Sequence, residues 1–93
     1  MQGFLIERYW PGVTLDDVAG LNDRLDASSS PAATFLASIL VTDDEVVMVE
    51  FDAVDAAAVL EVSSRAGLRC DRIVAVTRLV STRGHQSDTE LGA

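Results

Sequence analysis

The clearest hydrophobic pattern of the chain lies between Thr34 and Phe51. Two runs rich in Val, Ile, Leu and Phe, Thr34–Val41 and Val46–Phe51, are separated by the polar and acidic stretch 42–45. Branched and aromatic side chains suit a pleated, half-buried surface, and a short acidic linker between two such runs is a turn signal. The pattern predicts a β-hairpin at the centre of the sequence.

The segment before this hairpin has apolar residues at helical spacing. Apolar residues recur at Leu15, Val18, Leu21 and Leu25, which predicts one amphipathic helix over residues 15–27. The residue before it, Thr14, is the expected N-cap, and two aspartates follow in the first turn, where negative charge favours the helix dipole. Three serines and a proline end the helix, because proline removes a backbone donor and restricts the residue before it.

A second helix is expected after the hairpin, over residues 56–66. Asp55 is its expected N-cap, and Gly67 stands where a left-handed C-cap belongs. Val54, Ala58 and Val62 are the residues that we expect on its inward stripe.

Two more strand-like runs lie outside the helices. Phe4–Trp10 is bulky and aromatic and stops at a Pro-Gly turn pair. The second run is Arg72–Val80, in which Arg72, Val74, Val76 and Arg78 alternate with Ile73, Ala75, Thr77 and Leu79. From Ser81 onward the residues are small, polar and charged. We therefore expect one domain over residues 1–80 and a disordered tail over 81–93, which holds the only histidine, His85, without partners that would make it a ligand.

The expected order is β-α-β-β-α-β, which is the α+β ferredoxin-like arrangement. Its four-stranded antiparallel sheet has the strand order 4-1-3-2, and right-handed crossovers place both helices on one face. All four predicted strands carry apolar groups on both faces, as in a sheet that is covered on both sides. The simplest cover for the second face is another copy, so the sequence predicts a homodimer of the dimeric α+β barrel type.

Composition narrows the possible partners. The 93 residues carry a net charge of −8 with a pI near 4.3, which disfavours nucleic acid and anionic membrane surfaces. The N-terminal residues lack the basic start of a secretory signal, and no apolar run is long enough for a membrane helix. The single cysteine, Cys70, allows no intramolecular disulfide. We expect a cytoplasmic protein.

Two carboxylates form the main candidate for chemistry. Glu7 and Glu50 each interrupt an apolar run in one of the two central strands, which we take as parallel neighbours. If they share a sheet face, they could hold a divalent cation, or act as a general acid or base with Tyr9 as a donor. The structural alternative is an ion pair, for example between Glu7 and Arg78.

Other candidates carry weaker signals. The acidic stretch Asp43–Glu45 lacks the alternating spacing and the glycine of a calcium loop, so an exposed hairpin turn is favoured. Cys70 lies near Arg69 and Arg72, and such cations can lower the pKa of a thiol, but a loop cysteine without a histidine or a resolving partner is favoured to be unreactive.

Several short motifs resemble a group of small bacterial ferredoxin-like proteins of unknown function, some of which are described as nickel-binding. The opening Phe4–Arg8 followed by Pro-Gly is similar to theirs, and Val41–Asp44 resembles their hairpin. Arg65–Leu68 with Asp71–Ile73 resembles the exit of their second helix. The resemblance covers residues 4–80 and implies the fold, the sheet-to-sheet dimer and possible binding of a metal such as nickel.

The chain departs from that group where a metal would be held. Relatives often carry a histidine late in the second helix, where this chain reads Glu61–Ser64, and a cysteine in the third strand, where it has Met48. Imidazole and thiolate are the ligands that nickel favours. Glu7 is retained, which keeps that position of interest.

Two functional hypotheses follow. The first is a dimeric module that binds a small molecule or a metal ion, with Glu7 and Glu50 as polar contacts or metal ligands and with Tyr9, Trp10 and Met48 lining the site. Arg78 is a further ligand contact.

The second hypothesis is a small dimeric α+β barrel enzyme, of the cyclase, isomerase or cofactor-free monooxygenase type, acting on a hydrophobic substrate. Glu7 would then be the general base, and Tyr9 or Arg78 would stabilise an oxyanion. A purely structural or regulatory protein that has lost an ancestral site remains the third possibility.

Overall fold

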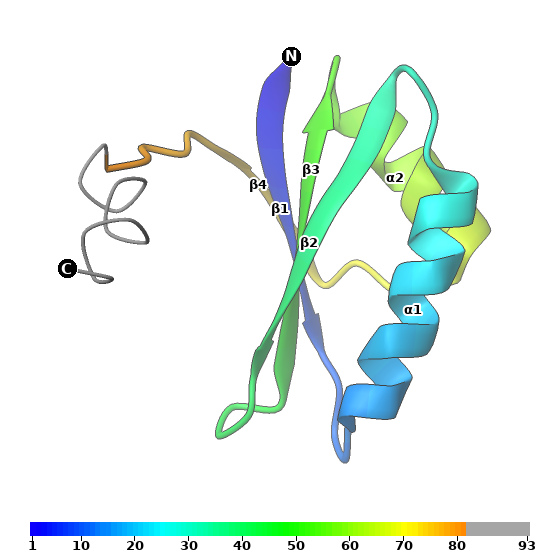
Figure 1. Ribbon diagram of the computed structural model, residues 1–93, viewed down its shortest axis with the longest axis vertical. Helices are drawn as coiled ribbons and strands as arrows, with labels where there is room; N and C mark the ends of the chain where they lie inside the picture. Colours follow the sequence, from blue (N-terminus) through cyan, green and yellow to red (C-terminus); the bar gives the residue numbers. More distant parts are fainter. Residues whose placement is uncertain (82–93) are drawn as a thin grey trace, which may run out of the picture.

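A computed structural model describes residues 1–81 of the chain. Two helices lie beside one four-stranded sheet (Figure 1). The elements are β1 (Gln2–Tyr9), α1 (Leu15–Ser28), β2 (Ala33–Val41), β3 (Val46–Ala53), α2 (Ala56–Ala66) and β4 (Arg72–Val76). This order confirms the α+β ferredoxin-like prediction. Except for Ser81, the predicted tail, with His85, lies outside the described residues.

The sheet order is β2-β3-β1-β4, and every neighbouring pair is antiparallel. The expectation that the two central strands run parallel was therefore wrong. The helical crossover makes β1 and β2 parallel, and the hairpin then reverses β3, which lies between them. In the resulting register Glu7 is opposite Met48, and Leu5 is opposite Glu50.

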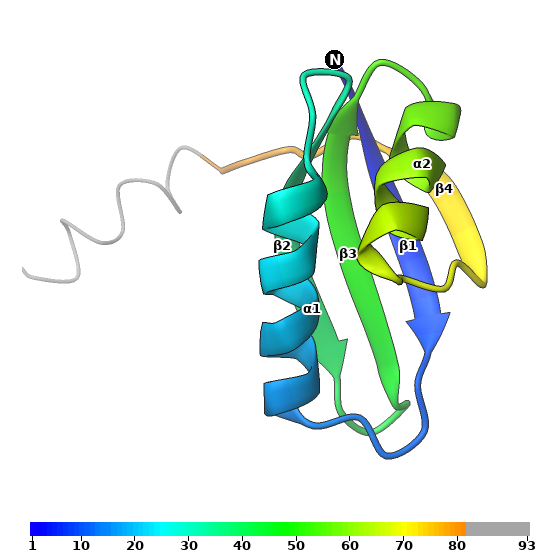
Figure 2. The same ribbon diagram turned by 90° about the vertical axis from the view of Figure 1, so that its right-hand side faces the viewer.

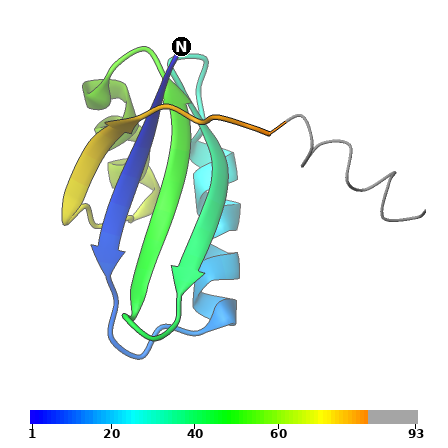
Figure 3. The same cartoon turned by 90° about the vertical axis from the view of Figure 1, so that its left-hand side faces the viewer.

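Both helices cover the same face of the sheet, and the core lies between them and the strands (Figure 2). On this face the strands contribute Phe4, Ile6, Val47, Val49 and Phe51. From the helices come Val18, Leu21, Leu25, Val59 and Val62. The opposite face carries no helix and is visible along its length in Figure 3. We call it the open face.

Both helix starts follow the predicted caps. The Thr14 hydroxyl accepts the Asp17 N–H at 3.1 Å, while the Asp17 carboxylate accepts the Thr14 N–H at 2.9 Å. Asp55 accepts the Ala58 N–H at 2.9 Å, and Gly67 ends α2 with a φ of 74°. A side-chain N-cap contributes about 1 kcal/mol to stability.

The inward stripes differ in detail from the prediction. Leu15 is 75% exposed and Val54 is 61% exposed, because each stands at or before the start of its helix, away from the sheet. In α2 the buried residues include Val59 and Ser63. Ser63 tolerates burial because its hydroxyl donates to the Val59 carbonyl at 2.8 Å. Within residues 1–81 neither helix is long and apolar enough to span a membrane.

β4 is shorter than predicted and ends at Val76 instead of Val80. Its only neighbour within residues 1–81 is β1, where Gly3 pairs with Val76, so almost no strand remains beyond this point to continue the ladder. Residues 77–81 instead leave the sheet edge and cross in front of β1 and β3 on the open face (Figure 3). We call residues 77–81 the crossing segment.

Candidate functional site

The open face mixes apolar and charged side chains. Strand alternation places every second residue of each strand there, and the register fixes which residues are neighbours. The face carries Leu5, Glu7 and Tyr9 from β1, Met48, Glu50 and Asp52 from β3, Ile39 from β2, and Arg72 and Val74 from β4.

Glu7 and Glu50 share this face but do not lie side by side. Because Glu7 is opposite Met48, Glu50 is its diagonal neighbour, at a typical separation of about 7–8 Å. Glu7 forms an ion pair with Arg72 at 3.2 Å, across the β1–β4 ladder. Glu50 binds Arg78, whose Nε donates to Oε2 at 3.0 Å and whose Nη2 donates to Oε1.

The predicted alternative, an ion pair between Glu7 and Arg78, is not formed. Arg72 stands directly opposite Glu7 in the β1–β4 ladder and forms the ion pair with it instead. Arg78 lies beyond the end of β4, in the crossing segment, which carries its guanidinium over to β3. Each of the two carboxylates therefore has an arginine of its own.

The aromatic residues lie on opposite sides of the sheet. Tyr9 is on the open face and 52% exposed, whereas Trp10 packs against the core on the helix side. Met48 lies beside Glu7 on the open face. Tyr9 and Trp10 therefore cannot line one common ligand mouth, because the sheet separates them.

A pocket of about 340 Å³ lies on the open face, at the end where β1 begins. The crossing segment forms one wall and the first residues of the chain another. The lining residues are Met1, Gln2, Gly3, Leu36, Glu50, Asp52, Val76, Thr77 and Arg78. We call it the Glu50 pocket.

Among the predicted site residues, Glu50 and Arg78 line this pocket, and Glu7, Tyr9, Trp10 and Met48 do not. Asp52 was missed by sequence analysis because the predicted strand stopped at Phe51. The alternation of Val46, Met48 and Glu50 continues to Asp52 and was the signal that could have identified it.

Glu50 is the one carboxylate that is buried among residues 1–81, at 8% exposure. A buried carboxylate needs a cation or hydrogen-bond donors, because it has lost its water. Arg78 supplies both, although the Arg78 side chain is itself 59% exposed. Asp52, two residues further along the same strand face, is partly buried and forms no ion pair with the described part of the chain.

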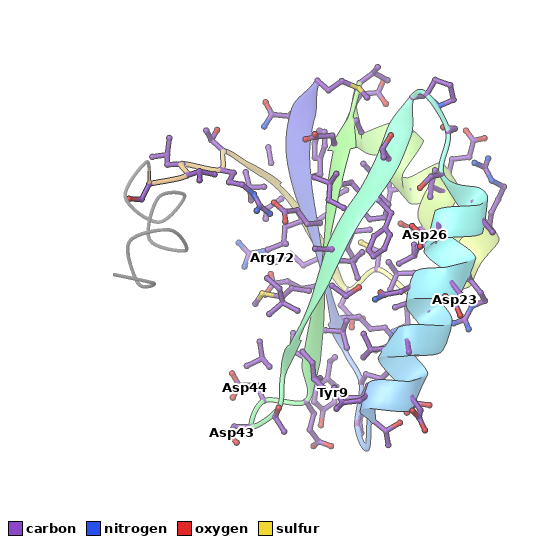
Figure 4. All side chains as sticks on the ribbon, in the orientation of Figure 1. Tyr9, Asp23, Asp26, Asp43, Asp44 and Arg72 are labelled. Atoms are coloured by element: carbon purple, nitrogen blue, oxygen red, sulfur yellow. The ribbon has the colours of Figure 1, made fainter. Side chains whose placement is uncertain are left out.

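The acidic hairpin turn serves a structural purpose. Glu45 has a positive φ of 53°, and its carboxylate accepts the Gly12 N–H at 2.6 Å. Its carbonyl also accepts the Trp10 N–H at 2.7 Å, so the turn holds the loop between β1 and α1. Asp43 and Asp44 point away from the molecule (Figure 4).

Cys70 is not activated by its arginine neighbours. Burial raises the pKa of the Cys70 thiol, and the Asp71 carboxylate beside it raises the pKa further. The lowered pKa that the neighbouring arginines could have produced is therefore not found. Asp71 holds the loop before β4, because its carboxylate accepts the Tyr9 N–H at 2.7 Å and two hydrogen bonds from Arg69.

Two comparisons with known proteins identify relatives, and no curated protein sequence matches the chain. The model of the family described as "Nickel responsive protein SCO4226-like" matches residues 4–76. The crystal structure of SCO4226 from Streptomyces coelicolor A3(2) superposes with a TM-score of 0.74 at 21% sequence identity. The match covers 84% of this chain and 99% of that one, and at this identity it shows the shared fold. The chain therefore belongs to the SCO4226-like family of nickel responsive proteins.

Proposed function

We propose that the protein is a small binding module that takes a divalent cation in the Glu50 pocket. The observation that carries this proposal is a buried carboxylate at an open pocket with a second carboxylate two residues away on the same strand face. The side chains that line the pocket include the carboxylates of Glu50 and Asp52 and the guanidinium of Arg78. They leave an excess of negative charge, which favours a positively charged ligand.

Arg78 then occupies the place that the cation would take. The crossing segment that carries it lies beyond the end of β4 and joins no strand of the described sheet. The Arg78 side chain is 59% exposed, so its guanidinium can return to water, while the buried Glu50 carboxylate still needs a positive charge beside it. A divalent cation near Glu50 and Asp52 can therefore replace the guanidinium.

A resident nickel ion does not fit the donors of one chain. No group of three His, Cys, Asp or Glu side chains converges anywhere in residues 1–81. The pocket supplies hard carboxylate oxygens, whereas nickel favours imidazole and thiolate. We therefore propose an exchangeable cation that keeps most of its water, as ions held by one or two carboxylates do.

We further propose that two copies of this cytoplasmic protein associate through their open faces. Tyr9, Leu36 and Ile39 leave about half of their surfaces exposed there, at 52%, 46% and 50%. The face carries little net charge, since both glutamates have arginine partners and Asp52 is the carboxylate left over. Two such faces can approach although each chain carries a net charge of −8.

The general-base hypothesis receives less support from the geometry. Glu7 is held by Arg72 and does not line the pocket. Tyr9, its expected assistant, is half exposed at the other end of β1 from the pocket. A base needs a substrate beside it, and the enclosed space lies beside Glu50 instead.

Calorimetric titration with Mn²⁺ and Ni²⁺ tests the cation proposal. We expect Asp52→Asn to weaken binding by about tenfold, since one of two carboxylate ligands is lost. Arg78→Gln should strengthen binding several-fold, because it removes the competing guanidinium. Asp43→Asn, in the exposed hairpin turn, is the matched control and should leave binding unchanged.

Two results would contradict the proposal. One is the absence of saturable binding of either cation to the wild-type chain. The other is an Asp52→Asn variant that binds as the Asp43→Asn control does.

A further inference from the structure

The helix side of the sheet has a second region with unused binding capacity, at the end of β1. Figure 2 shows that α2 stops short of this end, while α1 runs along the sheet on the β2 side. Arg8 stands on the helix side here, opposite Val47 of β3. Trp10 follows two residues later and packs against the core.

Within residues 1–81 the Arg8 side chain has no hydrogen-bond acceptor of its own. Its Nε atom is buried and has no partner among the described residues. The guanidinium carbon lies 3.8 Å from the centroid of the Trp10 ring, which fixes the plane of the group. An arginine remains charged at all physiological pH values and has five N–H donors to satisfy.

Two further arginines converge on this region. Arg24 of α1 donates from Nε to the Ala66 carbonyl at 2.8 Å, at the end of α2. Arg69 lies in the loop that follows α2, where its Nε and Nη2 donate to Asp71 and its Nη1 is left for a ligand. Burial lowers the pKa of Arg8, and the positive charges of Arg69 and Arg24 lower it further, since each of these guanidiniums lies within electrostatic reach of Arg8.

The nearby carboxylates are already engaged. Asp71, whose charge opposes the lowering of the Arg8 pKa, accepts hydrogen bonds from the Tyr9 N–H and from Arg69. Asp17 accepts the Thr14 N–H in the capping box of α1. Neither carboxylate hydrogen-bonds to Arg8, so its donors have no anionic acceptor within the described part of the chain.

We propose that Arg8, Arg24 and Arg69 form a binding site for a small oxyanion, a phosphate or carboxylate group, on the helix side of the sheet. We call it the arginine cluster. It lies on the opposite side of the sheet from the Glu50 pocket and does not depend on the cation proposal.

An oxyanion suits this geometry better than a halide does. The planar guanidinium fork presents parallel N–H groups that match two oxygens of a phosphate or carboxylate. The stacked Trp10 ring orients that fork before the ligand arrives, which reduces the entropy lost on binding. The strongly acidic surface elsewhere repels anions, so binding should be confined to this site.

Trp10 is the only tryptophan, and its fluorescence therefore reports on the arginine cluster directly. We would titrate the full chain with inorganic phosphate and, separately, with acetate, at an ionic strength held constant with sodium chloride. We expect a saturable change in Trp10 emission with at least one oxyanion. Calorimetry on the same samples gives a second, independent measurement.

Three variants locate the site. Arg8→Gln should abolish saturable binding, and Arg69→Gln should weaken it several-fold. Arg69 is exposed, so Arg69→Gln still tests the site if Arg8→Gln folds poorly. Arg65→Gln is the matched control, because Arg65 lies on α2 in an ion pair with Glu61 at 2.7 Å and should have no effect.

The possible outcomes separate clearly. Saturation by phosphate alone, by acetate alone or by both supports the site and tells which group it prefers. The proposal is overturned if neither oxyanion gives a saturable response, or if sodium chloride alone gives the same response. Equal binding by wild type and Arg69→Gln would also overturn it.

Discussion

The two faces of the sheet are built from alternate residues of the same strands, yet they have become different surfaces. On the helix side, Ile6, Val49 and Phe51 are fully buried and form a dry core. On the open face lie Glu7 and Glu50, which follow Ile6 and Val49 in the sequence, and each has an arginine partner. Most of the helix side is used up by the folding of the chain, apart from the end of β1 that carries Arg8, and the open face is left for binding.

The difference shows why apolar content alone cannot identify the functional face. Leu5, Met48 and Val74 on the open face are as apolar as core residues. The charged residues between them mark the face that does not belong to the core, because a buried charge requires a partner. Four predictions test this distinction, beginning with the largest expected effect.

The largest effect should come from the core side of β3. Phe51 is fully buried and contacts Phe35 edge to face, with 6.2 Å between the ring centroids. Phe51→Ala should lower the free energy of unfolding by about 3–5 kcal/mol, since it leaves a cavity. Met48→Ala, on the other face of the same strand, should cost less than half as much in chemical denaturation. Equal losses would contradict the distinction between the faces.

The next effect concerns association of the open faces. Ile39→Asp should raise the dissociation constant of the proposed dimer by at least about tenfold, because a charge enters an apolar contact. Leu60→Asp, on α2 and 42% exposed, changes a similar side chain away from the open face and should not affect association. Sedimentation velocity measures both variants. If wild type sediments as a monomer at all concentrations, the dimer proposal is wrong.

The smallest effect lies at the sheet edge, where Asp71 holds the loop before β4. The Tyr9 N–H, followed by Arg69, lowers the pKa of the Asp71 carboxyl in the folded chain. A lowered folded pKa means that ionised Asp71 stabilises the fold above the unfolded pKa of about 4, and that this contribution is lost as the pH falls through the folded pKa.

The stability difference between wild type and Asp71→Asn should therefore be constant from about pH 6 to 8 and shrink below about pH 4. Thermal unfolding at several pH values measures it. A stability difference that grows toward acid pH would contradict a lowered pKa of Asp71 in the folded chain.

Much of the fold could be predicted because local signals agreed with one another. Thr14, Asp55 and Gly67 marked helix ends that the structure confirms, and hydrophobic runs located the strands. The end of β4 could not be predicted from its own residues. It depends on where the neighbouring strand β1 begins, which is a tertiary property.

The site was harder to predict than the fold for the same reason. The sequence indicated Glu7 and Glu50 as unusual charges in apolar strands, and both lie on the open face. Their partners could not be assigned, since Arg78 reaches Glu50 only because the chain leaves the sheet after Val76. Nothing in the sequence marked Arg8 as a binding residue. Its lack of a hydrogen-bond acceptor among the described residues depends on which carboxylates the surrounding loops engage.

Paramagnetic line broadening tests most directly where the cation binds. The chain offers other exposed carboxylates, including Asp23 and Asp26 on α1 and Asp43 and Asp44 at the hairpin turn (Figure 4). With Mn²⁺ added to ¹⁵N-labelled protein, the amides of Gly3, Asp52 and Thr77 should broaden first. Initial broadening on α1 or at the hairpin turn, with those three amides unaffected, would contradict a cation site in the Glu50 pocket.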